Sequence, residues 1–165
     1  MSADQQLVAV CGLPGVGKSS VAEQLTERLG GIRLRTDAVR KELVDEPTYS
    51  AAETERVYDA FVKRAKNTLK GGYSVILDAT FRKQSQRERV HRVAADESVQ
   101  FTLIHVVCDD DIVEQRIRIR DDISDADVDV FRQLKSEFEP IELDHERIDN
   151  SGTREETAEQ VSRLF

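Results

Sequence analysis

A glycine-rich segment near the N-terminus has the residue types and spacing that bind phosphate groups. Residues 12–19 read GLPGVGKS and match the pattern G-x-x-x-x-G-K-[S/T]. In this pattern the glycines let backbone N–H groups turn toward phosphate oxygens, the lysine reaches the terminal phosphates, and the serine hydroxyl ligates Mg²⁺. The segment therefore predicts a site for ATP with Mg²⁺. The predicted nucleotide-binding residues are Gly12, Leu13, Pro14, Gly15, Val16, Gly17, Lys18, Ser19 and Ser20.

A carboxylate that could complete the metal site follows a hydrophobic run. Asp78 comes directly after the run VIL at residues 75–77. An aspartate at the C-terminal end of a strand beside the P-loop strand holds the Mg²⁺ shell, directly or through water. We therefore predict that Ser19 and Asp78 form the metal site, with Lys18 as a catalytic residue. The alternative is an aspartate that caps a helix or a turn.

An aspartate and an arginine lie three residues apart at the start of a predicted helix. Asp37 and Arg40 lie on neighbouring positions of its first turn. We predict that Asp37 is a catalytic base that accepts the proton of an attacking hydroxyl. Arg40 would then hold a polar or anionic part of the acceptor. The alternative is that Asp37 only caps the helix.

Arginines in the second half of the chain suggest a lid over the nucleotide. Arg116 and Arg120 share a helical face just before an aspartate-rich segment. In phosphoryl transfer a mobile arginine offsets charge on the transferring oxygens. We therefore predict a lid around residues 116–127 with Arg120, or Arg116 in its place, as a catalytic residue. The alternative is a solvated helix face that pairs with the acids of residues 109–114.

The order of the predicted elements is that of a parallel α/β sheet. Residues 18–29 carry apolar side chains at every fourth position and stop at two glycines, which predicts an amphipathic helix with a glycine terminator. Further helical patterns follow each strand, and strands alternating with helices imply a parallel sheet covered on both faces. With no linker or repeat, residues 1–165 are predicted to form a single domain. Predicted strands cover residues 7–11, 32–36, 75–77, 101–107 and a short segment near Ile148.

Composition excludes several classes of protein. The chain has 32 acidic and 24 basic residues and a net charge of −8, which does not favour coating of duplex nucleic acid. No apolar run approaches the roughly 20 residues of a membrane span, so a cytoplasmic protein with no membrane partner is predicted. The preference for arginine over lysine, together with clustered aspartates, suggests a halophilic source.

The two cysteines indicate neither a disulfide framework nor a metal site. Cys11 and Cys108 each end a hydrophobic run, which predicts two buried, reduced thiols. The three histidines have no metal-like spacing with one another or with the cysteines, and are interpreted as surface or core residues.

Taken together, four segments resemble a known family. They read GLPGVGKSS, RTDAVRKEL, VILDATF, and RIRIR with the later SDAD and FEP, and they cover nearly the whole chain. The set resembles the small P-loop kinase-like ATPases, which include the kinase domain of 5′-hydroxyl polynucleotide kinases, gluconate-kinase-like enzymes and chloramphenicol phosphotransferase-like enzymes. The first segment is common to many families, whereas the set is more specific.

The resemblance implies a fold and a set of roles. The fold would be a three-layer α/β P-loop sheet of five parallel strands in the order 2-3-1-4-5. In the polynucleotide-kinase branch the residue matching Asp37 is the general base, the one matching Arg40 contacts the acceptor, and the lid arginine corresponds best to Arg120. The strand order would bring Asp37, Arg40, Asp78 and Thr80 together.

A local excess of arginine and lysine bears on the acceptor. Arg82, a predicted substrate-binding residue beside Thr80, begins a basic cluster that continues to Arg92 and would lie near Arg40. Such a cluster suggests an anionic acceptor, because arginine binds carboxylate and phosphate alike. The alternative is a helix surface paired with nearby acids. Aromatic residues make up only 5% of the chain, which weakens the case for a polynucleotide.

These features predict an ATP-dependent kinase. The γ-phosphoryl group would pass to a hydroxyl of a small or nucleic-acid-derived, anionic acceptor, such as a nucleoside, a 5′-hydroxyl polynucleotide or a sugar acid. One alternative is a nucleotide-dependent switch or partner-binding module with slow ATPase activity, which needs only the P-loop, Asp78 and responsive loops. A toxin-like kinase acting on an activated sugar is a third possibility, for which the chain is short.

Overall fold

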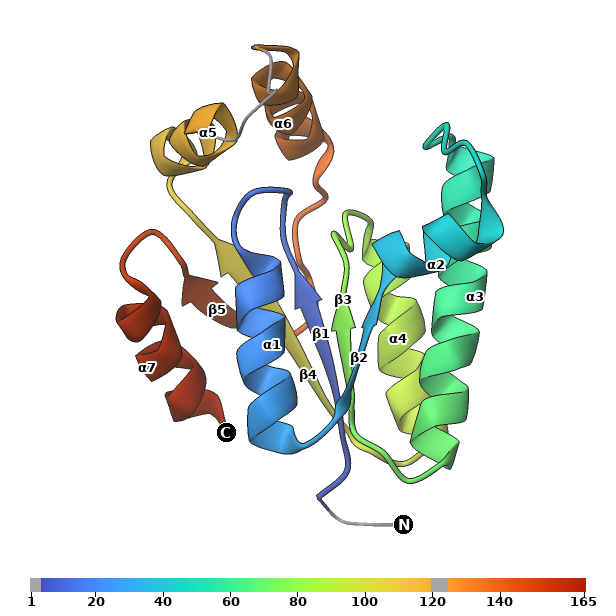
Figure 1. The fold of residues 1–165 in the computed structure, drawn as a ribbon. Coiled ribbons are helices and arrows are strands. Elements are labelled where there is room, and N and C mark those ends of the chain that lie inside the picture. Colours follow the sequence, from blue (N-terminus) through green and yellow to red (C-terminus); the bar gives the residue numbers. More distant parts are fainter. Residues whose placement is uncertain (1–3, 120–124) are drawn as a thin grey trace.

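In the computed structural model, which describes residues 4–119 and 125–165, strands and helices alternate along the chain (Figure 1). The strands are β1 (Gln6–Cys11), β2 (Ile32–Arg35), β3 (Val75–Asp78), β4 (Gln100–Val107) and β5 (Glu146–Asp149). The helices are α1 (Lys18–Leu29), α2 (Thr36–Leu43), α3 (Ala51–Lys70), α4 (Gln84–Asp96), α5 (Asp110–Ile119), α6 (Asp125–Glu137) and α7 (Arg154–Leu164).

The strands form one parallel sheet in the order β2-β3-β1-β4-β5, which confirms the predicted order 2-3-1-4-5. Asp78, the last residue of β3, pairs with Val10 of β1 on one side and with Arg35 of β2 on the other. The carboxyl ends of these three strands therefore lie next to one another, and the P-loop leaves β1, directly beside the end of β3.

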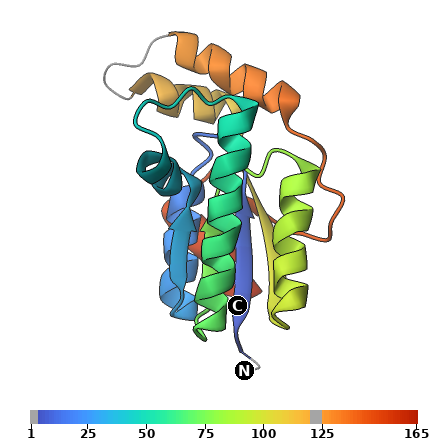
Figure 2. The ribbon, with the colours of Figure 1, turned by 90° about the vertical axis from the view of Figure 1, so that its right-hand side faces the viewer.

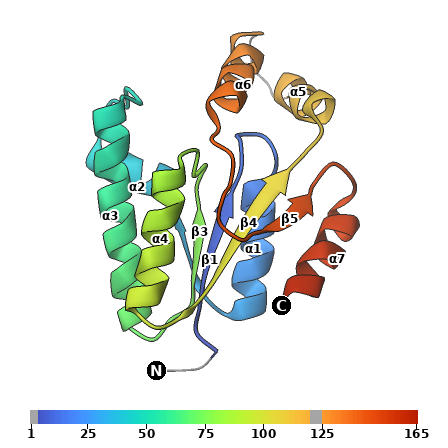
Figure 3. The ribbon, with the colours of Figure 1, turned by 180° about the vertical axis from the view of Figure 1, so that it is seen from behind.

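Helices cover both faces of the sheet, so the three-layer prediction is confirmed (Figure 2). Alternate residues of a strand point to opposite faces. Leu7 of β1 accordingly belongs to the core cluster beneath α3 and α4, whereas Val8 belongs to the cluster beneath α1 and α7. Helices α5 and α6 lie beyond the carboxyl ends of the strands, over the P-loop (Figures 1 and 3).

The predicted end of the first helix is confirmed in detail. Gly30 follows α1 with a left-handed φ of 63° and donates its N–H to the carbonyl of Thr26, which a residue with a side chain would do only under strain. The second strand ends at Arg35 rather than Thr36, because Thr36 is already the first residue of α2.

The two cysteines differ in burial. Cys11 is fully buried, and burial raises the pKa of its thiol to about 12, so it is an inert core residue as predicted. The prediction was wrong for Cys108, which is only half-buried because it lies beyond the end of β4. Within residues 4–119 and 125–165 no helix is both long and apolar enough to cross a bilayer.

Candidate active site

The glycine-rich segment forms the connection between β1 and α1. Gly17 precedes the helix with a φ of 92°, and a Cβ atom there would lie 2.0 Å from the side-chain nitrogen of Asn150. A Cβ on Gly12 would lie 2.6 Å from the carbonyl oxygen of Val106. These two glycines are therefore needed for close packing as well as for backbone conformation.

Lys18 begins α1 with its side chain turned back over the loop. Its ammonium donates to the carbonyl of Leu13 at 3.1 Å. Burial lowers the pKa of the Lys18 ammonium, and the negative charges of Asp78 and Asp37 partly offset this effect. A polyanion placed against the loop would favour the charged form in the same way.

Ser19 and Asp78 lie together, as the metal-site prediction requires. The Ser19 hydroxyl donates to the Asp78 carboxylate at 3.3 Å, and the Asp78 residue is only 6% exposed. Arg33 of β2 holds the same carboxylate oxygen at 2.7 Å. Two hard oxygen donors side by side fit Mg²⁺, which takes few protein ligands and keeps several waters. Asp78 ends a strand and accepts a hydrogen bond from Ser19. Its carboxylate therefore has a side-chain partner in the site, which the alternative of a helix or turn cap does not require.

Asp37 projects from the first turn of α2 into the space around the phosphate loop. Its side chain is 72% exposed, and the N-cap position of α2 is held by Arg35, whose side chain makes no capping hydrogen bond. Asp37 lines a cavity of about 370 Å³ together with Lys18, Ser19 and Asp78. It also lines a neighbouring cavity of about 280 Å³. A carboxylate in this position can accept a proton from a group that reaches between the two cavities.

The second cavity is bordered by the predicted acceptor residues. Asp37, Arg40, Thr80 and Arg82 all line it. Its wall also includes the half-buried or buried side chains of Thr36, Thr54, Tyr58 and Gln86. Asp78 lines the phosphate cavity and not this one. Thr80 lines both, and its backbone carbonyl accepts the N–H of Gly12 at 3.3 Å.

Arg40 is held by the helix that follows it. Only 8% of the residue is exposed; its guanidinium forms an ion pair with Glu53 and stacks on Tyr49, with 4.6 Å from Cζ to the ring centroid. Backbone N–H groups of Thr48 and Tyr49 also donate to the Glu53 carboxylate, each at 2.9 Å. These hydrogen bonds, that from Thr48 first, lower the pKa of Glu53. Arg40 and Glu53 thereby fix the loop between α2 and α3 beside the acceptor cavity.

The basic cluster after β3 is largely paired within the protein. Arg87 is completely buried and donates to the backbone carbonyls of Phe81, Glu139 and Pro140. Arg89 pairs with Asp59 at 2.7 Å. The interpretation of the whole cluster as an anion site was therefore wrong for these two residues. Arg82 pairs with Glu137 at 2.8 Å and still borders the acceptor cavity.

The predicted lid residues fall partly outside the described part of the chain. Arg120 lies outside it, as do residues 121–124 and the side chains of residues 125–127. Arg116 is described: its guanidinium donates to the backbone carbonyl of Asn150 at 2.9 Å and to the sulfur of Cys108 at 3.4 Å. It thus contacts the loop after β5 rather than the acids of residues 109–114.

Asn150 is a site residue that the sequence did not reveal. Its side-chain amide donates to the carbonyl of Val16 in the P-loop at 2.8 Å, and its side-chain oxygen accepts from the Thr157 hydroxyl at 2.6 Å. Asn150 therefore ties the phosphate loop to the start of α7. In the sequence it reads as part of an ordinary turn, NSG, and no spacing links it to the P-loop.

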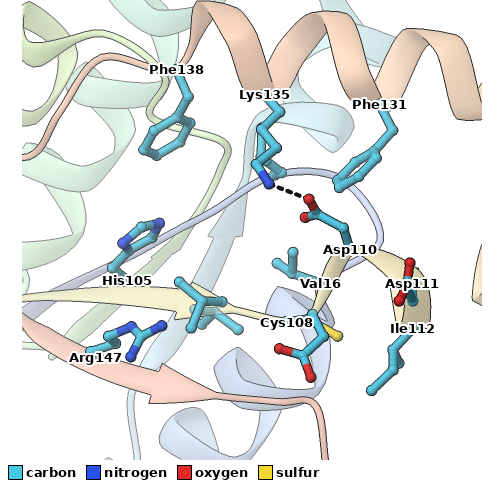
Figure 4. Close-up of a pocket in the computed structure, with 14 residues that line it drawn as sticks. Val16, His105, Cys108, Asp110, Asp111, Ile112, Phe131, Lys135, Phe138 and Arg147 are labelled. Atoms are coloured by element: carbon cyan, nitrogen blue, oxygen red, sulfur yellow. Dashed lines mark hydrogen bonds and ion pairs between the residues drawn. The ribbon is translucent and has the colours of Figure 1, made fainter. Parts of the chain in front are cut away.

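A larger cavity lies on the other side of the P-loop (Figure 4). Its volume is about 910 Å³, and its lining comes from the end of β4, the start of α5, from α6, from Arg147 of β5, and from Leu13 and Val16. His105 stacks on Phe138 within it, with 5.3 Å between ring centroids. Burial, followed by the nearby His145, lowers the pKa of His105 to about 4. Among the described residues no group of three or more His, Cys, Asp or Glu side chains could hold a metal ion.

Comparison with known proteins agrees with this geometry. The family model described as an AAA domain matches residues 7–141. An uncharacterized protein of Mycobacterium tuberculosis is 30% identical over 173 aligned residues, which cover 97% of this chain and 34% of that protein. The chain thus spans about a third of the length of the curated relatives it matches.

Two solved structures share the fold over nearly their whole length. The APS kinase of Mycobacterium tuberculosis, in complex with AMPPNP and APS, has a TM-score of 0.76 and 20% identity, covering 97% of this chain and 96% of that one. A gluconokinase from Sinorhizobium meliloti has a TM-score of 0.73 and 16% identity, covering 99% and 95%. At these identities the likeness establishes the arrangement of the elements.

Proposed function

The chain belongs to this AAA domain family of P-loop proteins, and we propose that it is a kinase that transfers the γ-phosphoryl group of ATP to a hydroxyl of a second substrate. The observation that carries the proposal is the position of Asp37. It borders both the cavity that contains Lys18 and Ser19 and the neighbouring cavity lined by Arg40 and Thr80. A carboxylate between the two cavities is in a position to take a proton from a hydroxyl of an acceptor bound in the second cavity.

The residues of the site divide the reaction among them. The loop N–H groups and Lys18 hold the phosphates, and Asp37 accepts the proton of the acceptor hydroxyl as its oxygen bonds to the γ-phosphorus. The bond from that phosphorus to the bridging oxygen of ADP breaks. Ser19 and Asp78 would hold Mg²⁺, which would supply positive charge to offset that of the phosphates.

The acceptor that suits the site is small or nucleic-acid-derived, and anionic. A further cavity of about 370 Å³ next to Asp37 is lined by Arg35, Arg40 and Lys41. Because Arg40 is engaged by Glu53 and Arg35 also lines the phosphate cavity, Lys41 is the side chain that would bind a carboxylate or phosphate there. A nucleoside carrying such a group, a 5′-hydroxyl oligonucleotide end and a sugar acid all fit this description. That the structural neighbours include an APS kinase and a gluconokinase supports a small anionic acceptor.

The lid arginine is part of the same proposal. Removal of Arg120, or of Arg116 if Arg120 is not the lid residue, is expected to lower kcat far more than ATP affinity. The alternative is that Arg116 has only a structural role, through its hydrogen bond to the loop after β5. In that case its removal would lower the stability of the fold and leave kcat unchanged.

A phosphoryl-transfer screen tests the proposal. The protein is incubated with ATP labelled in the γ-phosphate and with nucleosides, 5′-hydroxyl oligonucleotides or sugar acids, and labelled products are separated from inorganic phosphate. Transfer to one class, lost in Lys18→Ala and Asp37→Ala, is the expected result. Release of inorganic phosphate alone, with equal rates in the wild type and Asp37→Ala, would favour the nucleotide-dependent switch.

A further inference from the structure

Arg35 occupies a position that neither the P-loop pattern nor the lid accounts for. It is the last residue of β2 and pairs in register with Asp78, the last residue of β3. The next helix begins immediately after it, with Asp37 in its first turn. Arg35 therefore stands between the proposed metal-binding carboxylate and the proposed base.

The Arg35 guanidinium is near both carboxylates and bound tightly by neither. Its Nη2 lies 3.8 Å from an oxygen of Asp37, and its Nε lies 3.9 Å from an oxygen of Asp78. Both distances exceed those of a hydrogen bond. Its side chain is 45% exposed, whereas that of Arg33, on the same strand, is 18% exposed and bonds Asp78 at 2.7 Å. Arg33 fixes the carboxylate, and Arg35 keeps donors available.

Arg35 lines the phosphate cavity as well as the cavity beside Lys41. The lining of the phosphate cavity includes Pro14, Gly15, Lys18, Ser19, Arg35, Asp37 and Asp78. Within the described part of the chain, Lys18 and Arg35 are the two cationic side chains of that lining. Lys18 approaches from the P-loop side and Arg35 from the β2 side, so a phosphoryl group between them would have a positive charge on each flank.

We propose that Arg35 is a further catalytic residue, which donates hydrogen bonds to the phosphoryl group as it transfers; the proposal rests on the kinase function inferred above. As the oxygen–phosphorus bond to ADP breaks and the bond to the acceptor oxygen forms, charge spreads over the transferring oxygens. The planar guanidinium stabilises that charge with fixed donors. The acceptor proton passes to Asp37, so Arg35 gains and loses no proton.

Arg35 differs from a lid arginine in that it extends from a strand of the sheet. A lid arginine reaches the phosphoryl group only when the lid closes. Arg35 belongs to β2, whose residues pair in register with those of β3, so its backbone is already in place. The described lid residue Arg116 contacts Asn150 and Cys108 and does not line the phosphate cavity. Arg35 thus supplies charge stabilisation from the end of a paired strand, without closure of a lid.

Arg35→Gln and Arg35→Lys test the proposal without an identified acceptor. Three quantities are measured: the Kd of Mg²⁺ with AMPPNP, the single-turnover rate of ATP consumption with water as acceptor, and the Kd of Mg²⁺ with ADP and aluminium fluoride, which mimics the transferring group. Arg64→Gln, which removes a similarly exposed arginine from α3, is the matched control. Arg33→Gln serves as the contrast, because that residue acts through Asp78.

Arg35→Gln is expected to slow ATP consumption and to weaken aluminium fluoride binding by about 100-fold or more, while AMPPNP affinity stays within about threefold. Arg35→Lys is expected to recover only a part of the loss, because a point charge does not replace the planar donor pair. Arg64→Gln should behave as the wild type. Arg33→Gln should instead raise the Mg²⁺ concentration needed for half-maximal rate.

Two results would overturn the inference, and a third would overturn its premise. If Arg35→Gln weakened AMPPNP and aluminium fluoride binding equally, Arg35 would only position Asp78 and Asp37. Unchanged rates and affinities would give it no role in the transfer. If the wild type bound neither AMPPNP nor the aluminium fluoride complex, the nucleotide site itself, and with it the proposed kinase function, would be wrong.

Discussion

The hydroxyl of Ser19 donates a hydrogen bond of 3.3 Å to the carboxylate of Asp78, although 59 residues separate them in the chain. The P-loop and the end of β3 therefore present their oxygens to a common point. If Mg²⁺ is held there, Ser19→Ala should raise the Mg²⁺ concentration for half-maximal ATP consumption by about 10-fold or more. A Mg²⁺ titration at fixed ATP measures this, with Ser162→Ala on the exposed part of α7 as control. An unshifted titration would remove Ser19 from the metal site.

Asn150 should matter for the P-loop even though it lies outside the glycine-rich pattern. Asn150→Ala removes the donor to the Val16 carbonyl and the acceptor of the Thr157 hydroxyl. Loss of these partly buried hydrogen bonds should cost about 1–3 kcal/mol in the free energy of unfolding. It should also weaken ATP binding, because the loop loses its tie to α7. Chemical denaturation and nucleotide titration measure the two effects.

The other asparagine of the chain offers a matched control for this test. Asn67 is exposed on α3, far along the chain from the P-loop, and Asn67→Ala should leave both stability and ATP affinity within experimental error of the wild type. If Asn150→Ala behaved like Asn67→Ala, the bonds to Val16 and Thr157 would be incidental to the loop.

His105 should make the protein less stable in mild acid. Burial, and after it the positive charges of His145, Arg87 and Arg147, lower the pKa of His105 from 6.5 to about 4. Between these values the unfolded chain binds a proton at this position and the folded chain does not. Stability from this source is therefore complete above about pH 6.5 and is lost as the pH falls toward 4.

The measurement compares denaturation at pH 7 and at pH 5. His105→Gln should reduce the loss of stability between these two values, whatever its effect at pH 7. His91→Gln, on the exposed surface of α4, is the matched substitution and should leave the difference between the two pH values unchanged. An equal acid loss in His105→Gln and the wild type would show that other groups account for it.

The sequence was most informative where local pattern and chemistry coincide. Residues 12–19, the glycine after α1 and the buried strands could be predicted because each depends on neighbours in the chain. Pairing between distant elements could not. Arg87 looks like an exposed helical arginine, yet the segment after α6 folds back over α4 and accepts its hydrogen bonds. The role of Asn150 could not be predicted for the same reason, since its partner Val16 is 134 residues away in the chain.

The arginines of β2 show the same limit within the site. Alternation along a strand does not say which carboxylates the neighbouring strand presents to Arg33 and Arg35. Only the register of β2 with β3 places Asp78 beside them. The strand order that follows from the resemblance predicted that β2 and β3 would be neighbours. It did not predict that Arg33 would engage Asp78 while Arg35 stayed more open to the phosphate cavity.

The last prediction concerns Asp37 as the base of the transfer reaction. Asp37→Asn keeps the size of the side chain and removes its ability to take a proton. Because the side chain is 72% exposed and lies near Arg35 at 3.8 Å without a hydrogen bond, the free energy of unfolding should change by no more than about 1 kcal/mol. ATP should bind normally, since Lys18 and Ser19 are untouched.

The rate of transfer to the true acceptor should nevertheless fall by about 100-fold or more, because loss of a general base typically costs 10² to 10⁴ in rate. Asp45→Asn, an exposed acid just after α2, is the control and should transfer at the wild-type rate. If Asp37 only stabilises the start of α2, the opposite pattern is expected, in which Asp37→Asn changes stability slightly and leaves transfer intact. Near-normal transfer by Asp37→Asn would therefore assign this residue to the helix alone, while binding of ATP at the P-loop would still stand.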